Sequence, residues 1–175
     1  MKRFAVALAA CAALAAGCAT SPTPSYYTLN VDAAAAAPAR ALDRPTIAVG
    51  AVSVPDAVDR PQLVVRTGAN EVRIEELHRW AGPLKSELPR VMAGNISRVT
   101  GDPRVSAHPE SASLVADYRV LVDFQRFDGA PGGDVALDAL WTILAPNGDV
   151  VGSGRASIRE PVAGSGRLLA SLAGG

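Results

Sequence analysis

Three consecutive segments in the second half of the chain alternate apolar and polar residues, and this pattern constrains the fold most. The segments are residues 117–127, 135–145 and 150–158, and the sequence Pro-Asn-Gly-Asp at 146–149 is typical of a tight turn. A repeat of two residues is the period of a strand with one buried face. We therefore expect a three-stranded antiparallel meander with one apolar face.

The first half of the chain predicts further strands. Residues 46–54 are apolar and β-branched on both faces, as in a strand buried on both sides. Residues 63–66 and 71–74 flank a four-residue loop that offers Gly68 and Asn70 for positive φ, which predicts a hairpin. A short first strand is expected at about residues 26–31.

One long helix should follow the hairpin. Pro83 suits the first helical position, apolar residues recur at helical spacing from Leu84 to Val99, and Gly101 lies where a C-cap is expected. Pro89 should kink this helix or delay its start. These elements predict an α+β fold, with a single mixed or antiparallel sheet and one main helix packed on one face.

The C-terminus predicts a short or truncated helix. Residues 167–173 begin an apolar helical pattern that stops at Gly174-Gly175. Isolated helices below about 12 to 15 residues are marginal in water. We therefore expect the residues after Gly164 to be poorly ordered, and apolar sheet surface to be exposed beside them.

The N-terminus has the features of an export signal. Lys2-Arg3 precede an apolar run at residues 4–16, which is too short to cross a hydrocarbon core of about 30 Å. The following Ala15-Ala16-Gly17-Cys18 resembles a bacterial lipobox. That resemblance implies removal of residues 1–17 and a covalent lipid on Cys18, and Ala19 after the cysteine favours the outer membrane. The alternative is ordinary secretory cleavage with a free thiol at Cys18.

Three regions follow from this organisation. Residues 1–17 are the expected signal peptide. Residues 18–44 are a lipidated tether with the short first strand and an Ala/Pro-rich linker, and residues 45–175 form the folded domain.

The composition argues against several function classes. The chain has 17 basic and 17 acidic residues, so it lacks the basic excess of a nucleic-acid-binding protein. The two histidines, His78 and His108, are far apart in sequence and are expected at a helix entry and in a loop, with no third metal ligand nearby. No G-x-S-x-G nucleophile motif or phosphate-binding loop is present. We expect no catalytic residues, no metal and no cofactor other than the lipid on Cys18.

The acidic residues of the second half are interpreted as a solvated sheet face, because the alternation places them opposite the apolar residues. They are Asp117, Asp123, Asp128, Asp134 and Asp138.

Several short motifs together resemble the signature of one family. They are DRPQLVVR at 59–66, NEVRI at 70–74 and RWAGPL at 79–84, preceded by YYTL at 26–29 and VSVP at 52–55. In this order and spacing they are similar to the PqiC-type ABC-transport auxiliary lipoproteins. The resemblance covers most of the chain after the signal peptide.

This resemblance implies a non-enzymatic periplasmic subunit that is anchored to the outer membrane. It would work with an MCE-domain protein and associated inner-membrane components in lipid movement between membranes, and homo-oligomerisation is left open. The signature residues are either a scaffold for the hairpin or a partner-binding surface. They are Asp59, Arg60, Gln62, Arg79 and Trp80.

Two other function classes remain as alternatives. A lipid or small-ligand binding module would show an apolar cavity between helix and sheet, on the order of several hundred Å³. An envelope hydrolase that uses a histidine base would depend on His78 or His108.

Overall fold

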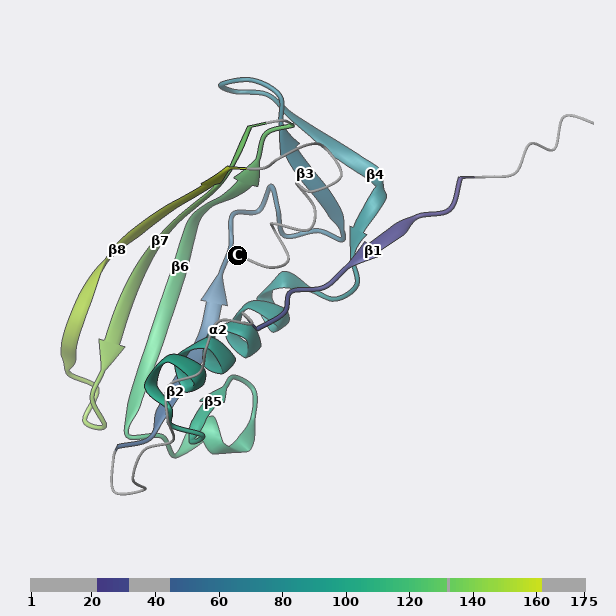
Figure 1. The fold of residues 1–175 in the computed structure, drawn as a ribbon. Helices are drawn as coiled ribbons and strands as arrows, with labels where there is room; N and C mark the ends of the chain where they lie inside the picture. Colours follow the sequence, from purple (N-terminus) through teal and green to yellow (C-terminus); the bar gives the residue numbers. More distant parts are fainter. Residues whose placement is uncertain (1–21, 32–44, 132, 162–175) are drawn as a thin grey trace, which may run out of the picture.

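The computed structural model describes residues 22–31, 45–131 and 133–161. The strands in these ranges form one mixed sheet, and one long helix packs on it (Figure 1). The predicted α+β fold class is confirmed. In chain order the elements are β1 (Ser25–Tyr27), β2 (Ile47–Ser53), β3 (Gln62–Arg66), β4 (Val72–Trp80), α2 (Leu84–Thr100), β5 (Val105–Ala107), the 3₁₀ helix η1 (Ser111–Leu114), β6 (Tyr118–Gly129), β7 (Asp134–Leu144) and β8 (Val150–Pro161).

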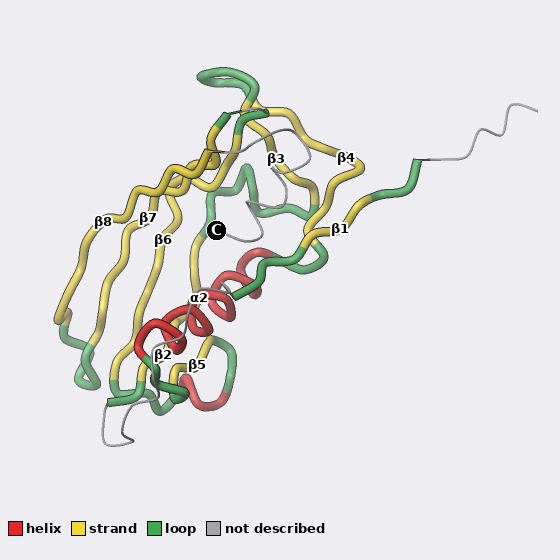
Figure 2. The backbone as a smooth tube through the Cα atoms, viewed as in Figure 1, coloured by secondary structure: helices red, strands yellow, loops and turns green. Residues whose placement is uncertain are grey.

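The long strand β6 joins the two parts of the sheet (Figure 2). On one side it pairs in parallel with β2 over its first half, and near its end it pairs with β3 at a single position, Val65 to Gly129. The hairpin partner β4 and then β1 extend the sheet beyond β3, and β5 extends it beyond β2. On its other side β6 pairs with β7, and β7 pairs with β8, both antiparallel.

The predicted meander is confirmed, but its alternation is interrupted by a bulge. The pairing of β6 with β7 shifts register between Phe124 and Arg126. An extra residue at a bulge reverses which face the following side chains occupy. Phe127 therefore returns to the apolar face and is 7% exposed, beside Phe124 at 5%.

The hairpin and the helix are confirmed with changes in detail. Strand β4 continues to Trp80, so His78 lies in a strand and not at the entry to a helix, as we had expected. The helix begins at Leu84 with Pro83 as its N-cap, and Pro89 lies inside the helix without delaying its start. Among the described residues only Gly101 and Gly148 have positive φ, so the expectation for Gly68 and Asn70 is wrong.

Helix α2 covers only part of the sheet. It packs on β2 and β5, where Val49, Ala93 and Ala107 form a small buried cluster. The larger core lies between the other side of the helix and the strands around β6, and includes Trp80 and Phe124. The predicted signal peptide, most of the tether and the C-terminal helix lie outside the described residues.

Candidate functional site

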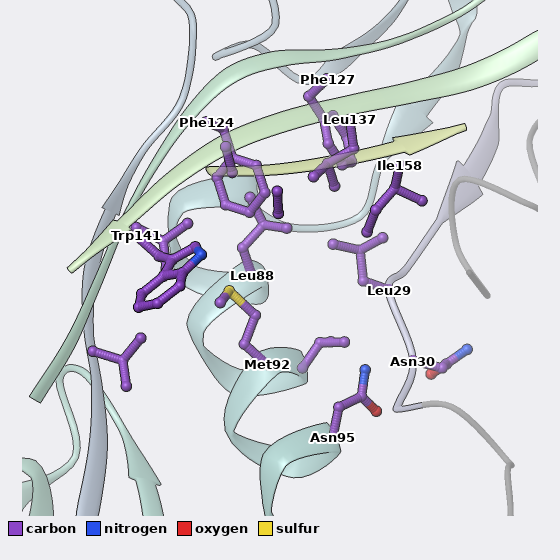
Figure 3. Close-up of a pocket in the computed structure, with 15 residues that line it drawn as sticks. Leu29, Asn30, Leu88, Met92, Asn95, Phe124, Phe127, Leu137, Trp141 and Ile158 are labelled. Carbon is purple, nitrogen blue, oxygen red and sulfur yellow. The ribbon is translucent and has the colours of Figure 1, made fainter. Parts of the chain in front are cut away.

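An apolar groove lies between α2 and the β6–β7–β8 meander (Figure 3). It has a volume of about 330 Å³. Its residues come from five segments: Leu29 and Asn30 after β1; Leu88, Val91, Met92 and Asn95 of α2; Val120, Val122, Phe124 and Phe127 of β6; Leu137, Ala139 and Trp141 of β7; and Ala156 and Ile158 of β8. None of these residues is charged, and the amides of Asn30 and Asn95 are the only polar side chains apart from the indole N–H.

The groove exists because the meander projects beyond the helix. The apolar residues of β6, β7 and β8 share one face through their register, in which Trp141 is opposite Gly154 and Leu137 is opposite Ile158. Helix α2 lies closest to β2 and β5, and Leu88 and Val91 pack against the buried part of the meander, so the groove is the space that remains between the helix and the outer part of the meander. Ile158, on the edge strand, remains 48% exposed.

Trp141 forms one wall of the groove by lying across two glycines of β8. A Cβ atom placed at Gly154 would lie 2.6 Å from Cζ2 of Trp141, and one placed at Gly152 would lie 3.6 Å from Cζ3. Contact below 3.0 Å is not tolerated without movement, so the absence of a side chain at Gly154 allows the indole ring to approach the strand. These two glycines therefore serve the packing of the indole ring.

The segment after β1 closes the other side of the groove. Leu29 is buried, and its carbonyl oxygen accepts a hydrogen bond of 2.9 Å from Arg90 of α2. Val31 lies against Gly94, where a Cβ atom would approach Val31 Cγ2 to 2.4 Å. The residues just before the expected linker are thus fixed to the helix. The helical and strand periodicities indicated most of the other lining residues, whereas no sequence signal placed Leu29 and Asn30 beside them.

A second, smaller hollow lies at the signature residues. It has a volume of about 280 Å³ and is lined by Arg60, Pro61, Trp80, Ala81, Gly82 and Pro83. The backbone N–H of Trp80 donates a 2.7 Å hydrogen bond to the carbonyl of Pro61, and Gln62 pairs in register with Arg79. The structure therefore brings the five predicted partner-binding residues to one end of the β3–β4 hairpin.

These residues differ in how much the fold uses them. Trp80 is 7% exposed and its ring lies 6.2 Å from that of Phe127, so it belongs to the core. Gln62 Nε2 donates to Glu76 Oε2 at 3.3 Å, and Arg79 Nε donates to the Glu76 carbonyl at 2.9 Å.

The remaining two signature residues are exposed. Asp59 accepts a 2.6 Å hydrogen bond from Lys85 Nζ, which raises the pKa of Lys85. The backbone N–H of Arg60 donates a 2.8 Å hydrogen bond to the carbonyl of Val58, but its guanidinium group makes no hydrogen bond or ion pair with the described part of the chain. Arg60 is thus the signature side chain that the fold uses least.

One acidic residue of the meander is buried, which corrects the prediction of a uniformly solvated face. Asp128 is 5% exposed, and its two carboxylate oxygens accept hydrogen bonds from Arg66 at 2.6 and 2.9 Å and from Arg126 at 3.0 Å. Burial alone would raise the pKa of Asp128, but the hydrogen bonds and positive charges of the two arginines outweigh it and lower the pKa.

Three other acids of the meander bind nearby polar groups. Asp117 accepts hydrogen bonds from the backbone N–H and hydroxyl of Thr46, and its pKa is lowered by them. Asp123 accepts from Ser53, and Asp138 accepts from Ser157 and also pairs with Arg159. These contacts hold neighbouring strands together.

The two histidines lie in separate elements. The ring of His78 on β4 is hydrogen-bonded to the hydroxyl of Tyr27 on β1 at 2.9 Å. His108 follows β5, and its backbone N–H donates to the carbonyl of Val49. Within residues 22–31, 45–131 and 133–161, no group of three His, Cys, Asp or Glu residues could hold a metal ion. None of the helices in these ranges is both long and apolar enough to cross a membrane.

One family model identifies the family of the chain, and solved structures share its fold. A family model described as "ABC-type transport auxiliary lipoprotein component" matches residues 27–172. A search of curated proteins gave no significant match.

Solved structures share the fold at low sequence identity. A crystal structure of an uncharacterized protein has a TM-score of 0.67 and 22% identity, covering 87% of this chain and 90% of the other. Protein XCC0632 from Xanthomonas campestris, of the family DUF330, has a TM-score of 0.65 and 19% identity, with 86% of each chain covered. A PelC variant from Paraburkholderia phytofirmans, crystallised as a dodecamer, is more distant at a TM-score of 0.43 and 19% identity, covering 78% of this chain and 84% of the other. Its assembly supports no conclusion about this chain.

Proposed function

The chain belongs to the ABC-type transport auxiliary lipoprotein family, and on that premise we propose that it is a non-enzymatic docking subunit of an MCE-type intermembrane lipid transport system. The observation that carries the proposal is the family match, which extends over residues 27–172 and includes most of the described residues. The non-enzymatic role rests on the description of the family as a transport auxiliary component.

We further propose that the protein is held on the periplasmic face of the outer membrane through a lipid on Cys18. The description of the family as lipoproteins supports the anchor. Two or three acyl chains together bind a protein firmly to a bilayer, since each buried methylene contributes about 0.8 kcal/mol. The preference for the outer membrane rests on Ala19, the residue that follows the lipidated cysteine.

The hollow at the signature residues is the proposed docking surface. Trp80 and the backbone of Pro61 form its base and are fixed by core packing and a hydrogen bond. The exposed Arg60 also lines it, with a guanidinium group that pairs with no described residue, and it follows Asp59 of the Asp59–Lys85 ion pair in the sequence. An apolar base with a charged rim is the usual arrangement of a protein–protein contact, and arginine is among the residues that contribute most to such contacts. We assign Arg60 to partner contact and Trp80 to support of the surface.

Crosslinking in intact cells followed by purification of the full-length lipoprotein would test this function. Recovery of an MCE-domain protein is expected. Arg60→Glu should reduce its recovery about tenfold or more, as for a central interface residue. Arg155→Glu is the matched control, because Arg155 is an exposed arginine on β8, outside the hollow.

Two results would contradict the proposal. Failure to recover any envelope transport protein would remove the docking function. Equal recovery with the Arg60 and Arg155 variants would keep the function but exclude this surface.

A further inference from the structure

The groove between α2 and the meander has properties that the docking role does not require. We propose that it binds a single hydrocarbon chain of a lipid, with the polar group of that lipid at the end marked by Asn30 and Asn95. This inference goes beyond the proposed docking function and holds whether or not the protein binds an MCE partner.

The chemistry of the walls favours a hydrocarbon occupant. The residues that face the space are aliphatic, aromatic or thioether side chains, and no charged side chain is among them. Met92 projects from the helix into the middle of the groove, opposite the sheet residues (Figure 3). Methionine is flexible and adapts to apolar ligands of different shape.

The polar groups of the groove lie where a lipid would need them. Figure 3 shows Asn30 and Asn95 on the side of the groove away from Trp141, on two different segments. An amide side chain has two donor hydrogens and an acceptor oxygen, so an amide that already has one partner within the chain, as Asn95 has, can still bind an uncharged ester or hydroxyl group.

The size of the groove favours one chain over larger occupants. Its volume of about 330 Å³ is at the lower end of the range for small-molecule sites, which is roughly 300–1,000 Å³. A docked helix is about 10–12 Å across with its side chains and would need a wider trough. Buried hydrocarbon contributes about 0.8 kcal/mol per methylene, so even one partly enclosed chain would bind measurably.

The test uses residues 18–175 with the single substitution Cys18→Ser, which prevents acylation. The probe is a lysophosphatidylcholine that carries bromine on its single acyl chain. Bromine quenches tryptophan fluorescence on contact. We expect saturable quenching below the concentration at which the lipid forms micelles, and native mass spectrometry should show one lipid per chain. In Trp141→Phe most of the quenching should be lost while the bound lipid is still detected by mass.

Two phenylalanine substitutions on β8 provide the matched pair. Ala156→Phe adds a ring inside the groove and should weaken binding about tenfold, which corresponds to the exclusion of about two methylene groups. Ser153→Phe adds the same ring to an exposed position on the other face of the strand, and should change affinity less than twofold by the same reasoning. Circular dichroism of both variants checks that they are folded.

Three results would overturn the inference. Absence of saturable quenching and of a lipid-bound mass would exclude hydrocarbon binding. Equal affinity of the two phenylalanine variants would show that the lipid binds elsewhere. Binding that occurs only after removal of residues 162–175 would identify that segment as the occupant in the intact chain.

Discussion

The ion cluster around Asp128 gives the sharpest stability prediction. Strand β3 is paired with β6 at only one position, Val65 to Gly129, so the β3–β4 hairpin has little backbone pairing to the rest of the sheet. Arg66 on β3 and Asp128 on β6 lie beside this position and bind each other through two hydrogen bonds. We expect Asp128→Asn to weaken the junction between the two parts of the sheet.

The size of the stability loss in Asp128→Asn depends on how deeply the three charged side chains are buried. Removing one partner of a fully buried ion pair costs about 3–5 kcal/mol, whereas an exposed pair contributes about 0–1 kcal/mol. The side chain of Asp128 is 7% exposed, but those of Arg66 and Arg126 are 32% and 35% exposed, so water can relieve part of the loss. We expect the free energy of unfolding at pH 7 to fall by about 2 kcal/mol, between these limits.

The pH dependence has a definite sign. The pKa of Asp128 is lowered in the folded state, so its contribution to stability is present above the unfolded carboxyl pKa of about 3.9. The contribution is lost as the pH falls through the lower folded pKa, because the proton then favours the unfolded chain. The difference between wild type and Asp128→Asn should be constant between about pH 7 and 5.5 and shrink below about pH 4.

Urea unfolding followed by tryptophan fluorescence at pH 7, 5.5 and 3.5 would measure this difference. Asp134→Asn is the control, because Asp134 is an exposed aspartate at the start of β7. The reasoning would be refuted by a loss at pH 7 below about 0.5 kcal/mol, the size expected of an ordinary surface substitution. It would also be refuted by a difference that grows on acidification.

Three further changes have expected outcomes. Gly154→Ala should displace the ring of Trp141 and lower stability by about 1–3 kcal/mol, seen as a reduced melting temperature; an unchanged value would show that the ring can move freely. Gly94→Ala should push the segment after β1 off the helix, so that hydrogen exchange of the Leu29 region increases while the β7–β8 ladder stays protected. Cys18→Ser should release the protein from the membrane fraction, since the acylation site is the proposed source of membrane affinity, and retention in that fraction would exclude the lipobox interpretation.

Sequence periodicity was sufficient to predict the secondary-structure elements that are long and regular. The meander and the helix each repeat over enough residues to show a period of two or of 3.6, and their boundaries differ from the predicted ones by at most a few residues. The hairpin was predicted from its loop residues, and its second strand continues to Trp80, well beyond the predicted end at residue 74. Strand β5 was missed because it has only three residues, Val105–Ala107, and forms through parallel pairing with β2. A strand this short carries no detectable period.

The features that the sequence did not show depend on contacts between distant residues. The bulge after Phe124 reverses the alternation of buried and exposed side chains along β6, and no local sequence pattern predicts it. Arg66 and Asp128 are 62 positions apart, so the partner that allows Asp128 to be buried is visible only in the folded chain. The apolar groove agrees with the cavity expected for a ligand-binding module, but its wall at Leu29 comes from a segment whose position no pattern predicted.

The placement of β1 has a mechanical consequence. β1 lies parallel to β4, with Ser25, Tyr26 and Tyr27 in register with His78, Arg79 and Trp80. Inter-strand hydrogen bonds run across the strand axis, and residues 22–24 lead from β1 away from the rest of the sheet (Figure 1). A force applied from the N-terminal side therefore acts on all the β1–β4 hydrogen bonds at once, in shear. The part of the force that these bonds do not carry acts on the hydrogen bond between the carbonyl of Leu29 and Arg90. Tension on the proposed lipid tether would thus be carried by β4 and α2, the two elements that flank the signature hollow.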